Sequence, residues 1–180
     1  MNYILIMTEG RTEQAFLNVL LEKNILKFKK EELLMEEIFQ SRQIDGEIKG
    51  YIQLLNCEDK VFIYRVGDTL KDKLKIPSAI LSDKIAGVVD ISTTPEFEIL
   101  FILNENLYNE FLKVKSSTKP CSFYMKHNKK YHKQFNFVCD YFSKMTNKEI
   151  INLINLYVKN HGKTTKNNQK TLKEIINDSL

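Results

Sequence analysis

The chain has 180 residues, of which 43% are hydrophobic, and this size and composition are typical of one globular domain with a sizeable core rather than of a disordered chain. No apolar run approaches the roughly 18 residues of a membrane span, and Met1 leads almost directly into a short apolar segment, so we expect a soluble, cytoplasmic protein without a membrane partner. Charge is divided unevenly: residues 1–112 hold 13 Lys/Arg and 19 Asp/Glu, a balance of −6, whereas residues 113–180 hold 14 Lys and 4 Asp/Glu, a balance of +10. Such a division suits carboxylates that bind a cation beside a surface for polyphosphate, but the composition of an AT-rich genome gives the same excess of lysine.

The first elements in chain order are a strand, a turn and a helix. Residues 3–7 form a short apolar run rich in β-formers, which predicts a strand buried on both faces. Gly10 permits a turn, Thr12 is a candidate N-cap, and apolar residues then recur at the spacing of one helical face. Residues 26–56 predict two further amphipathic helices, the first around Leu33, Leu34 and Ile38, on either side of the break at residues 45–46.

Two more apolar runs repeat the pattern of strand followed by helix. The apolar run over residues 61–66 predicts a second strand. Gly67 and Asp68 follow it, and the polar sequence after them has helical character. Residues 85–91 are followed by a Ser-Thr-Thr break and by Pro95, which suits the first turn of a helix that reaches Phe111. The alternation predicts an α/β fold with a short, mostly parallel sheet flanked by helices on both sides, in which the carboxyl ends of the strands share one edge.

Beyond residue 114 the pattern is helical. Apolar stripes over residues 131–142 and 150–157 predict two helices, a final helix is expected from about residue 169, and the polar stretch 159–170 is the best candidate for a linker or loop. The predicted organisation is therefore an α/β core over residues 1–113 and a basic helical portion over residues 114–180 that packs on this core, within a single compact domain.

Acidic residues follow two of the predicted strands. Glu9 and Asp68 are both expected at the carboxyl edge of the sheet, and Glu13 lies one helical turn after Glu9. Hard cations such as Mg²⁺ and Mn²⁺ take oxygen ligands held by rigid, separate elements, so these carboxylates are candidate metal ligands. Each also has an ordinary structural role open to it, because Asp is common in turns and acids are favoured in the first turn of a helix.

A dense basic stretch offers candidate contacts to phosphate. Lys126, Lys129, Lys130 and His132 lie close together in the sequence, as expected for a surface that neutralises nucleic-acid phosphates. A solvated, Lys-rich helix end has the same composition, so both interpretations stay open.

Three motifs resemble a known family. "ILIMTEGRTEQAFLNVLL", residues 4–21, resembles the first motif of Toprim domains, in the variant of the OLD-family nucleases and RloB-like proteins. "STTPEFEILFIL", residues 92–103, and more weakly "KHNKKYHKQF", residues 126–135, are similar to RloB-like segments, so the resemblance extends over roughly residues 1–140. It implies a Toprim-like α/β fold and a Mg²⁺- or Mn²⁺-dependent nuclease acting on DNA or RNA. The implied setting is bacterial anti-phage defence beside a separate ATPase partner.

The resemblance also implies roles for individual residues, with one departure. Glu9, Glu13 and Asp68 would be the catalytic, metal-holding residues, and Glu98, which aligns with the second motif, would be a further ligand. Toprim domains carry Asp-x-Asp after the second strand, whereas Val66 stands here in place of the first Asp.

Three consequences of this loss are open: a weakened one-metal site, compensation by Glu13, Asp72 or Glu98, or loss of catalysis. The alternatives to a nuclease are therefore a degenerate Toprim module that binds nucleic acid or a protein partner without cleavage, and a regulatory subunit of an assembly.

Overall fold

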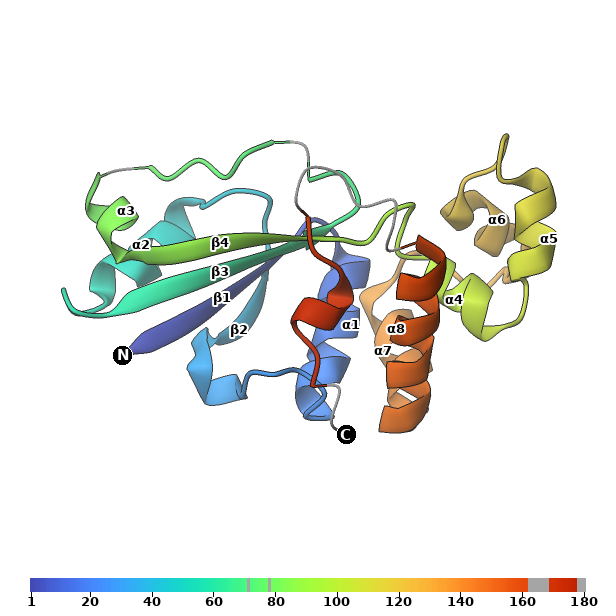
Figure 1. Cartoon of the computed structure of the whole chain (residues 1–180), viewed down its shortest axis with the longest axis horizontal. Helices are drawn as coiled ribbons and strands as arrows, with labels where there is room; N and C mark the ends of the chain where they lie inside the picture. Colours follow the sequence, from blue (N-terminus) through green and yellow to red (C-terminus); the bar gives the residue numbers. More distant parts are fainter. Residues whose placement is uncertain (71, 78, 162–168, 178–180) are drawn as a thin grey trace.

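The chain folds around a four-stranded, all-parallel sheet with helices on both faces (Figure 1). The structure, a computed structural model, describes residues 1–70, 72–77, 79–161 and 169–177, and of residues 79 and 80 it describes the backbone alone. The strand order is β2-β1-β3-β4. The strands are β1 (Asn2–Thr8), β2 (Leu33–Gln40), β3 (Lys60–Gly67) and β4 (Ile85–Ser92). The α/β class with a parallel sheet is the one that the sequence predicts.

Eight α-helices are described. They are α1 (Arg11–Glu22), α2 (Gly46–Leu54), α3 (Ala79–Lys84), α4 (Ile99–Asn104), α5 (Tyr108–Val114), α6 (Pro120–His127), α7 (Phe135–Ser143) and α8 (Asn147–His161), with short 3₁₀ turns η1 (Lys30–Glu32) and η3 (Leu172–Glu174). Within the described chain no helix has the length and apolar character that would let it cross a bilayer.

The sheet separates two hydrophobic cores, and alternate residues of its strands face one core or the other. Ile6 and Val66 point into the larger core with the apolar residues of α1, α4, α7 and α8, whereas Leu5 and Ile63 point into a smaller core with α2 and α3. The larger core also contains residues from α6 and from the segment after Lys170. The basic C-terminal portion is thus built into the same core as α1, because its apolar stripes have no other surface on which to bury.

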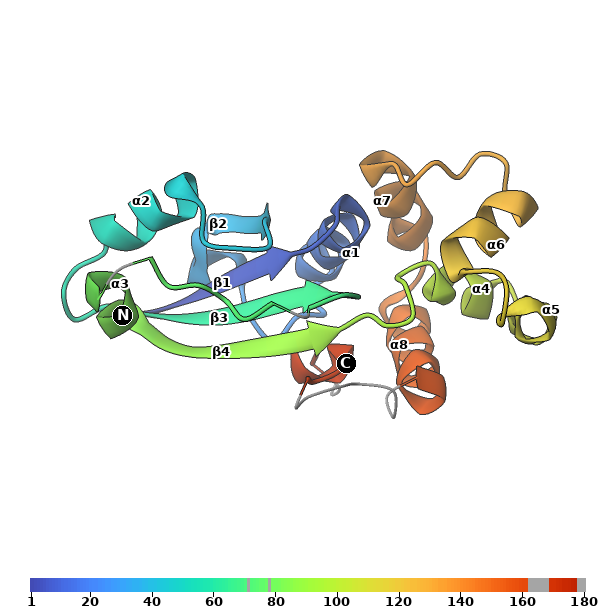
Figure 2. The same cartoon turned by 90° about the horizontal axis from the view of Figure 1, so that it is seen from above.

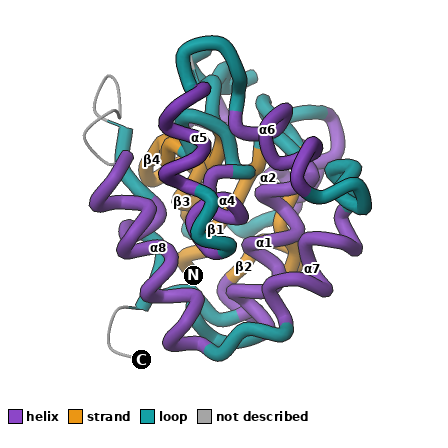
Figure 3. Tube along the Cα trace, turned by 90° about the vertical axis from the view of Figure 1, so that its right-hand side faces the viewer, coloured by secondary structure: helices purple, strands orange, loops and turns teal. Residues whose placement is uncertain are grey.

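The carboxyl ends of the strands meet at one edge of the sheet. Thr8 pairs with Val66, and Gly67 pairs with Ser92, so β1, β3 and β4 end close together. Figure 2 shows these ends pointing towards α4, α6, α7 and α8, and Figure 3 views the molecule from that side. In parallel sheets this edge is where ligands usually bind.

The helix predicted around residues 33–38 is wrong, because this segment is the edge strand β2. Met35 and Glu36 both have left-handed backbone, with φ of 56° each, and the register with β1 shifts at this point. Non-glycine residues with positive φ are uncommon, and these two interrupt the alternation of a strand. Leu33 and Ile38 consequently face one core while Leu34 faces the other, a spacing that imitates a helix.

The segment after β3 is an extended connection rather than the predicted helix. Its backbone groups bond to distant side chains: Lys75 N–H donates to Gln43 Oε1 at 2.8 Å, and the Lys73 carbonyl accepts from Gln43 Nε2 at 3.3 Å. The Leu70 carbonyl accepts from Gln169 Nε2 at 3.1 Å. These tertiary contacts replace the hydrogen bonds that a helix would make within itself.

Three predicted helices also differ from what the structure shows. The helix expected from Pro95 to Phe111 is two helices, α4 and α5, because Asn106 adopts left-handed backbone (φ 58°) and Leu107 N–H donates back to the Ile102 carbonyl at 2.9 Å, as at a helix C-terminus. The helix α7 begins at Phe135 rather than at residue 131. Over residues 169–177 the final helix is replaced by a bridge to β4 and the turn η3. Most of the predicted loop 159–170 lies outside the described residues.

Candidate functional site

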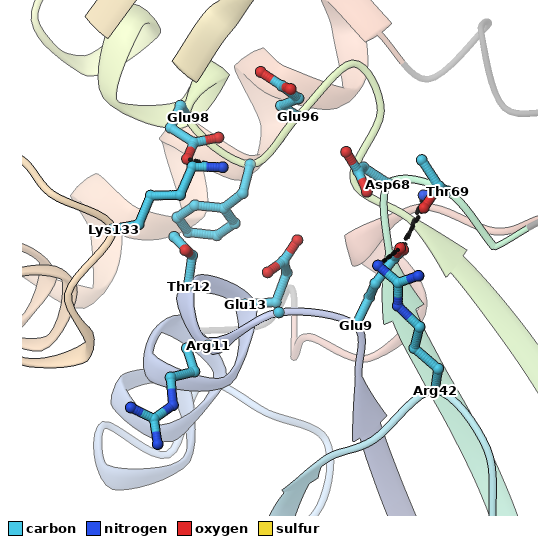
Figure 4. Close-up of a pocket in the computed structure, with 12 residues that line it drawn as sticks. Glu9, Arg11, Thr12, Glu13, Arg42, Asp68, Thr69, Glu96, Glu98 and Lys133 are labelled. Atoms are coloured by element: carbon cyan, nitrogen blue, oxygen red, sulfur yellow. Dashed lines mark hydrogen bonds and ion pairs between the residues drawn. The ribbon is translucent and has the colours of Figure 1, made fainter. Parts of the chain in front are cut away.

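A polar cleft of about 440 Å³ opens at the carboxyl edge of the sheet (Figure 4). Its walls come from the turn after β1, the first turn of α1, the end of β3, the loop before α4, and the loops after β2 and α6. The lining residues are Glu9, Gly10, Arg11, Thr12, Glu13, Arg42, Asp68, Thr69, Glu96, Phe97, Glu98 and Lys133. All four predicted metal ligands, Glu9, Glu13, Asp68 and Glu98, line this one cleft.

Two glycines allow the acidic side chains to come close to the backbone. A Cβ atom at Gly67 would lie 2.5 Å from Oε2 of Glu9, and one at Gly10 would lie 2.6 Å from Oε2 of Glu13. Both distances are shorter than van der Waals contact. Glycine at the end of β3 and before α1 is therefore what leaves room for the two carboxylates.

Glu9 is held in an ion pair at the edge of the cleft. Arg42 Nη2 lies 2.7 Å from Oε1 of Glu9, and Thr69 donates to the carboxylate from its hydroxyl and from its backbone N–H, the latter at 3.0 Å to Oε2. Burial alone raises the pKa of Glu9, but the bonds from Thr69 and the charge of Arg42 outweigh burial and hold this pKa below its ordinary value. Glu9 is therefore ionised at neutral pH.

Glu13 is the most perturbed carboxyl group of the cleft. It is 7% exposed, and the Thr93 hydroxyl donates to its Oε1 at 3.4 Å. Burial, together with the negative charges of Asp68, Glu98 and Glu9, raises the pKa of Glu13 to about 7. Figure 4 shows its carboxylate pointing into the space between Glu98 on one side and Asp68 with Glu9 on the other.

Asp68 follows β3 directly and faces the same space. Its backbone carbonyl accepts from the Thr94 hydroxyl at 3.2 Å, which ties the end of β3 to the loop after β4. Burial raises the pKa of Asp68, and the negative charges of Glu9 and Glu96 raise it further. Like charges in one partly desolvated cleft thus oppose one another's ionisation, an arrangement that a bound cation would relieve.

Glu98 is committed to contacts on the opposite wall. This residue is 2% exposed, its Oε1 accepts from the Tyr131 hydroxyl at 2.7 Å, and Lys133 Nζ lies 3.4 Å away. Glu98 is the N-cap residue of α4, so it lies just before this helix. Glu98 thus lines the cleft, as the predicted metal ligand should, but its carboxylate is already paired with the ammonium group of Lys133.

The residue that departs from the Toprim pattern, Val66, is part of the hydrophobic core. Val66 is 1% exposed and belongs to the larger hydrophobic core beside α1, so it supplies no ligand. Of the three residues considered as substitutes, Glu13 and Glu98 line the cleft, and Asp72 is exposed outside its lining. Glu13 is the one that lies between the other carboxylates.

The predicted phosphate-binding residues do not line the cleft. Lys126, Lys129, Lys130 and His132 are exposed around the end of α6 and the loop that follows it. From the same basic stretch, Lys133 reaches the cleft instead, from a left-handed backbone conformation (φ 54°). A strained lysine aimed at a buried acid is a feature common at functional sites.

Arg42 is the second cation of the cleft and was not predicted. It follows the edge strand β2, so its position depends on a strand that the sequence pattern presents as a helix. Arg11 also lines the cleft, but Figure 4 shows its guanidinium directed away from the carboxylates. The cleft thus has Arg42 at one end and Lys133 at the other.

The donor set suits a hard cation, although the ligands are not gathered around one point. Carboxylate oxygens are what Mg²⁺ and Mn²⁺ prefer. Among the described residues, however, no group of three acidic, histidine or cysteine side chains is arranged so that it could hold a metal ion. Binding by three carboxylates would therefore require side chains of the cleft to move towards one another.

Comparison with known proteins yields no relative for this chain: no family model, no curated protein and no solved structure matches it.

Proposed function

We propose that the protein is a Toprim-like, Mg²⁺- or Mn²⁺-dependent nuclease that hydrolyses phosphodiesters of DNA or RNA. One observation carries the proposal: Glu9, Glu13 and Asp68 come from three separate elements and line one cleft at the carboxyl edge of a parallel sheet. The parallel sheet and the Glu-Gly turn between β1 and α1 are also what the resemblance to Toprim domains implies.

Glu9, Asp68 and Glu13 would hold the cation. A divalent ion bound there would supply Lewis-acid stabilisation of the phosphate and activation of water. Glu13, whose pKa burial raises to about 7 in the absence of a cation, would give up its proton on binding the ion, so cation binding would be favoured as the pH rises. Ionised Glu9 would provide the permanent negative charge of the set.

Arg42 and Lys133 would engage the substrate's phosphate groups. The Arg42 side chain is 69% exposed despite its ion pair with Glu9, so its guanidinium can exchange a carboxylate for a phosphate, which it binds with the same geometry. The exposed residues Lys126, Lys129, Lys130 and His132 would extend this contact to flanking phosphates outside the cleft.

Cleavage assays test the proposal. Purified protein is incubated with supercoiled plasmid and with structured RNA, in Mn²⁺ or in EDTA, and compared with the Glu13→Gln and Asp68→Asn variants. Glu22→Gln, at the exposed end of α1, is the matched control. The proposal predicts cleavage that requires Mn²⁺, is lost in the two cleft variants and persists in the control. No metal-dependent cleavage of either substrate would refute it.

A second candidate function is binding without cleavage, by a degenerate Toprim module. Two observations favour it. Val66 is buried in the core where a Toprim domain carries an Asp, and the carboxylates of Glu9 and Glu98 are already in ion pairs, with Arg42 and Lys133 respectively. The same assays discriminate: salt-sensitive binding of nucleic acid with no metal-dependent cleavage supports this second function. Binding of a protein partner would instead appear as co-purification from the native host.

The biological setting follows from the resemblance to RloB-like proteins. We propose a role in bacterial defence against phage, beside a separate ATPase. The given sequence contains no complete Gly-x-x-x-x-Gly-Lys-Ser/Thr phosphate loop, because Tyr157 stands where the first Gly would precede Gly162 and Lys163. Co-purification from the native host tests this, and a stable complex with an ATPase is the expected result.

A further inference from the structure

A second chamber adjoins the carboxylate cleft and differs from it in chemistry. Its volume is about 390 Å³, and it shares Asp68, Thr69 and Glu96 with the cleft as a common wall. The remaining walls come from α5, the loop before α6 and the end of α8. They include Pro95, Tyr108, Phe111, Leu112, Lys115 and Lys119.

The inner surface of the chamber is apolar and aromatic. Phe111 is buried beneath it, and Tyr108, which is half-buried, stands edge-on to the His161 ring with centroids 5.7 Å apart. Burial raises the pKa of the Tyr108 phenol, which therefore stays neutral. Leu112 remains 38% exposed at the chamber, so apolar surface is left open to solvent there. An apolar, ring-lined chamber is suited to a flat aromatic ligand.

Two lysines stand at the rim of the chamber, whose shared wall with the cleft is acidic. Lys115 and Lys119 are both exposed, and Lys119 Nζ lies 4.0 Å from Oε1 of Glu96. Glu96 is itself fixed, because its Oε2 accepts the N–H of Cys121 in the first turn of α6 at 2.9 Å. Apolar walls with two exposed lysines beside them complement a nucleotide, whose planar base is apolar on its faces and whose phosphate is anionic.

We propose that this chamber binds one unpaired nucleobase of a single-stranded nucleic acid, next to the nucleotide whose phosphate enters the carboxylate cleft. The inference rests on the proposed function, and it specifies the substrate class as single strands or unpaired loops rather than duplex. A base can enter a recess of this kind when it is not stacked in a duplex. The wall shared through Asp68 makes the chamber and the cleft neighbouring positions along one strand.

Binding measured in EDTA tests the chamber independently of any metal-dependent reaction. The probes are a short fluorescein-labelled oligothymidylate and an abasic oligonucleotide of the same length and charge, and the readout is fluorescence anisotropy. Because stacking on an aromatic ring strengthens binding of each base, the base-containing strand should bind about fivefold or more tightly than the abasic one. Tyr108→Ala should remove this difference without weakening the abasic strand. Leu112→Glu, at an exposed position, provides a second variant if the first does not fold.

Matched controls separate the chamber from general effects. Tyr51→Ala, on α2 at the other face of the sheet, should keep the preference for the base-containing strand. Lys115→Glu should weaken both strands more than Lys113→Glu does, because Lys113 lies in the last turn of α5, next to Lys115 but outside the chamber. Equal affinity for the two strands, or an effect of Tyr51→Ala as large as that of Tyr108→Ala, would overturn the inference. Base-dependent binding without cleavage would instead refute the proposed nuclease and leave the chamber's ligand in place.

Discussion

Replacing Glu13 with Gln is expected to stabilise the protein at pH 8 and to change its stability little at pH 5. Burial raises the pKa of Glu13 from its ordinary value of 4.5 to about 7. Between these pH values the folded protein holds a proton that the unfolded chain has released, so the free energy of unfolding falls as the pH rises from about 4.5 to about 7 and then levels off. Since each pKa unit corresponds to about 1.4 kcal/mol, the full loss is about 3 kcal/mol.

Urea denaturation at several pH values between 5 and 8 measures this difference. Glu13→Gln carries no charge at any of them, so it should gain up to about 3 kcal/mol over the wild-type protein at pH 8 and should lose most of that gain at pH 5. Glu22→Gln, exposed on the same helix, should follow the wild type. A difference between Glu13→Gln and wild type that does not depend on pH would refute the reasoning that burial, with the neighbouring carboxylates, opposes Glu13's ionisation.

Three further perturbations test contacts of the fold and the cleft. Lys84→Met should lower the free energy of unfolding by about 1–3 kcal/mol, measured by urea denaturation. The reason is that the buried Lys84 ammonium donates to three carbonyls at the end of α2, with a shortest bond of 2.6 Å. An unchanged midpoint would contradict this. Gly67→Ala should weaken Mn²⁺ binding, measured by calorimetry, because the new Cβ would lie 2.6 Å from the Cβ of Glu9 and would displace this residue whichever way its carboxylate turns. Unaltered affinity would contradict a role for Glu9 as a ligand. Arg42→Ala should raise the pKa of Glu9, followed by carbon-detected NMR titration, because a neighbouring positive charge is removed; a lowered pKa would be inconsistent with the ion pair.

The sequence predicts the part of the fold that depends on regular patterns. The strands β1, β3 and β4 and the helix α1 carry continuous apolar runs or one-face spacing, so their positions follow from periodicity. The edge strand β2 escapes the prediction because left-handed residues at Met35 and Glu36 break its alternation. The extended segment after Asp68 escapes it because side chains distant in the sequence, such as Gln43, satisfy its backbone.

The sequence likewise predicts some residues of the candidate site and misses others. Glu9 and Asp68 are predictable because each directly follows a strand, and parallel strands end at one edge. Arg42 is not predictable, because its place in the cleft depends on β2. The basic stretch after α6 is visible in the sequence, but the local backbone of Lys133, with φ of 54°, selects which of its lysines reaches the cleft.

The central claim is that the carboxylates of the cleft bind a divalent cation together. Anomalous diffraction from a crystal soaked in Mn²⁺ tests it most directly. The account predicts a peak in the cleft within bonding distance of oxygens from Glu9, Asp68 and Glu13, with Glu9 turned away from Arg42. A fully soaked crystal with no peak in the cleft, and with Glu9 still paired to Arg42, would contradict it.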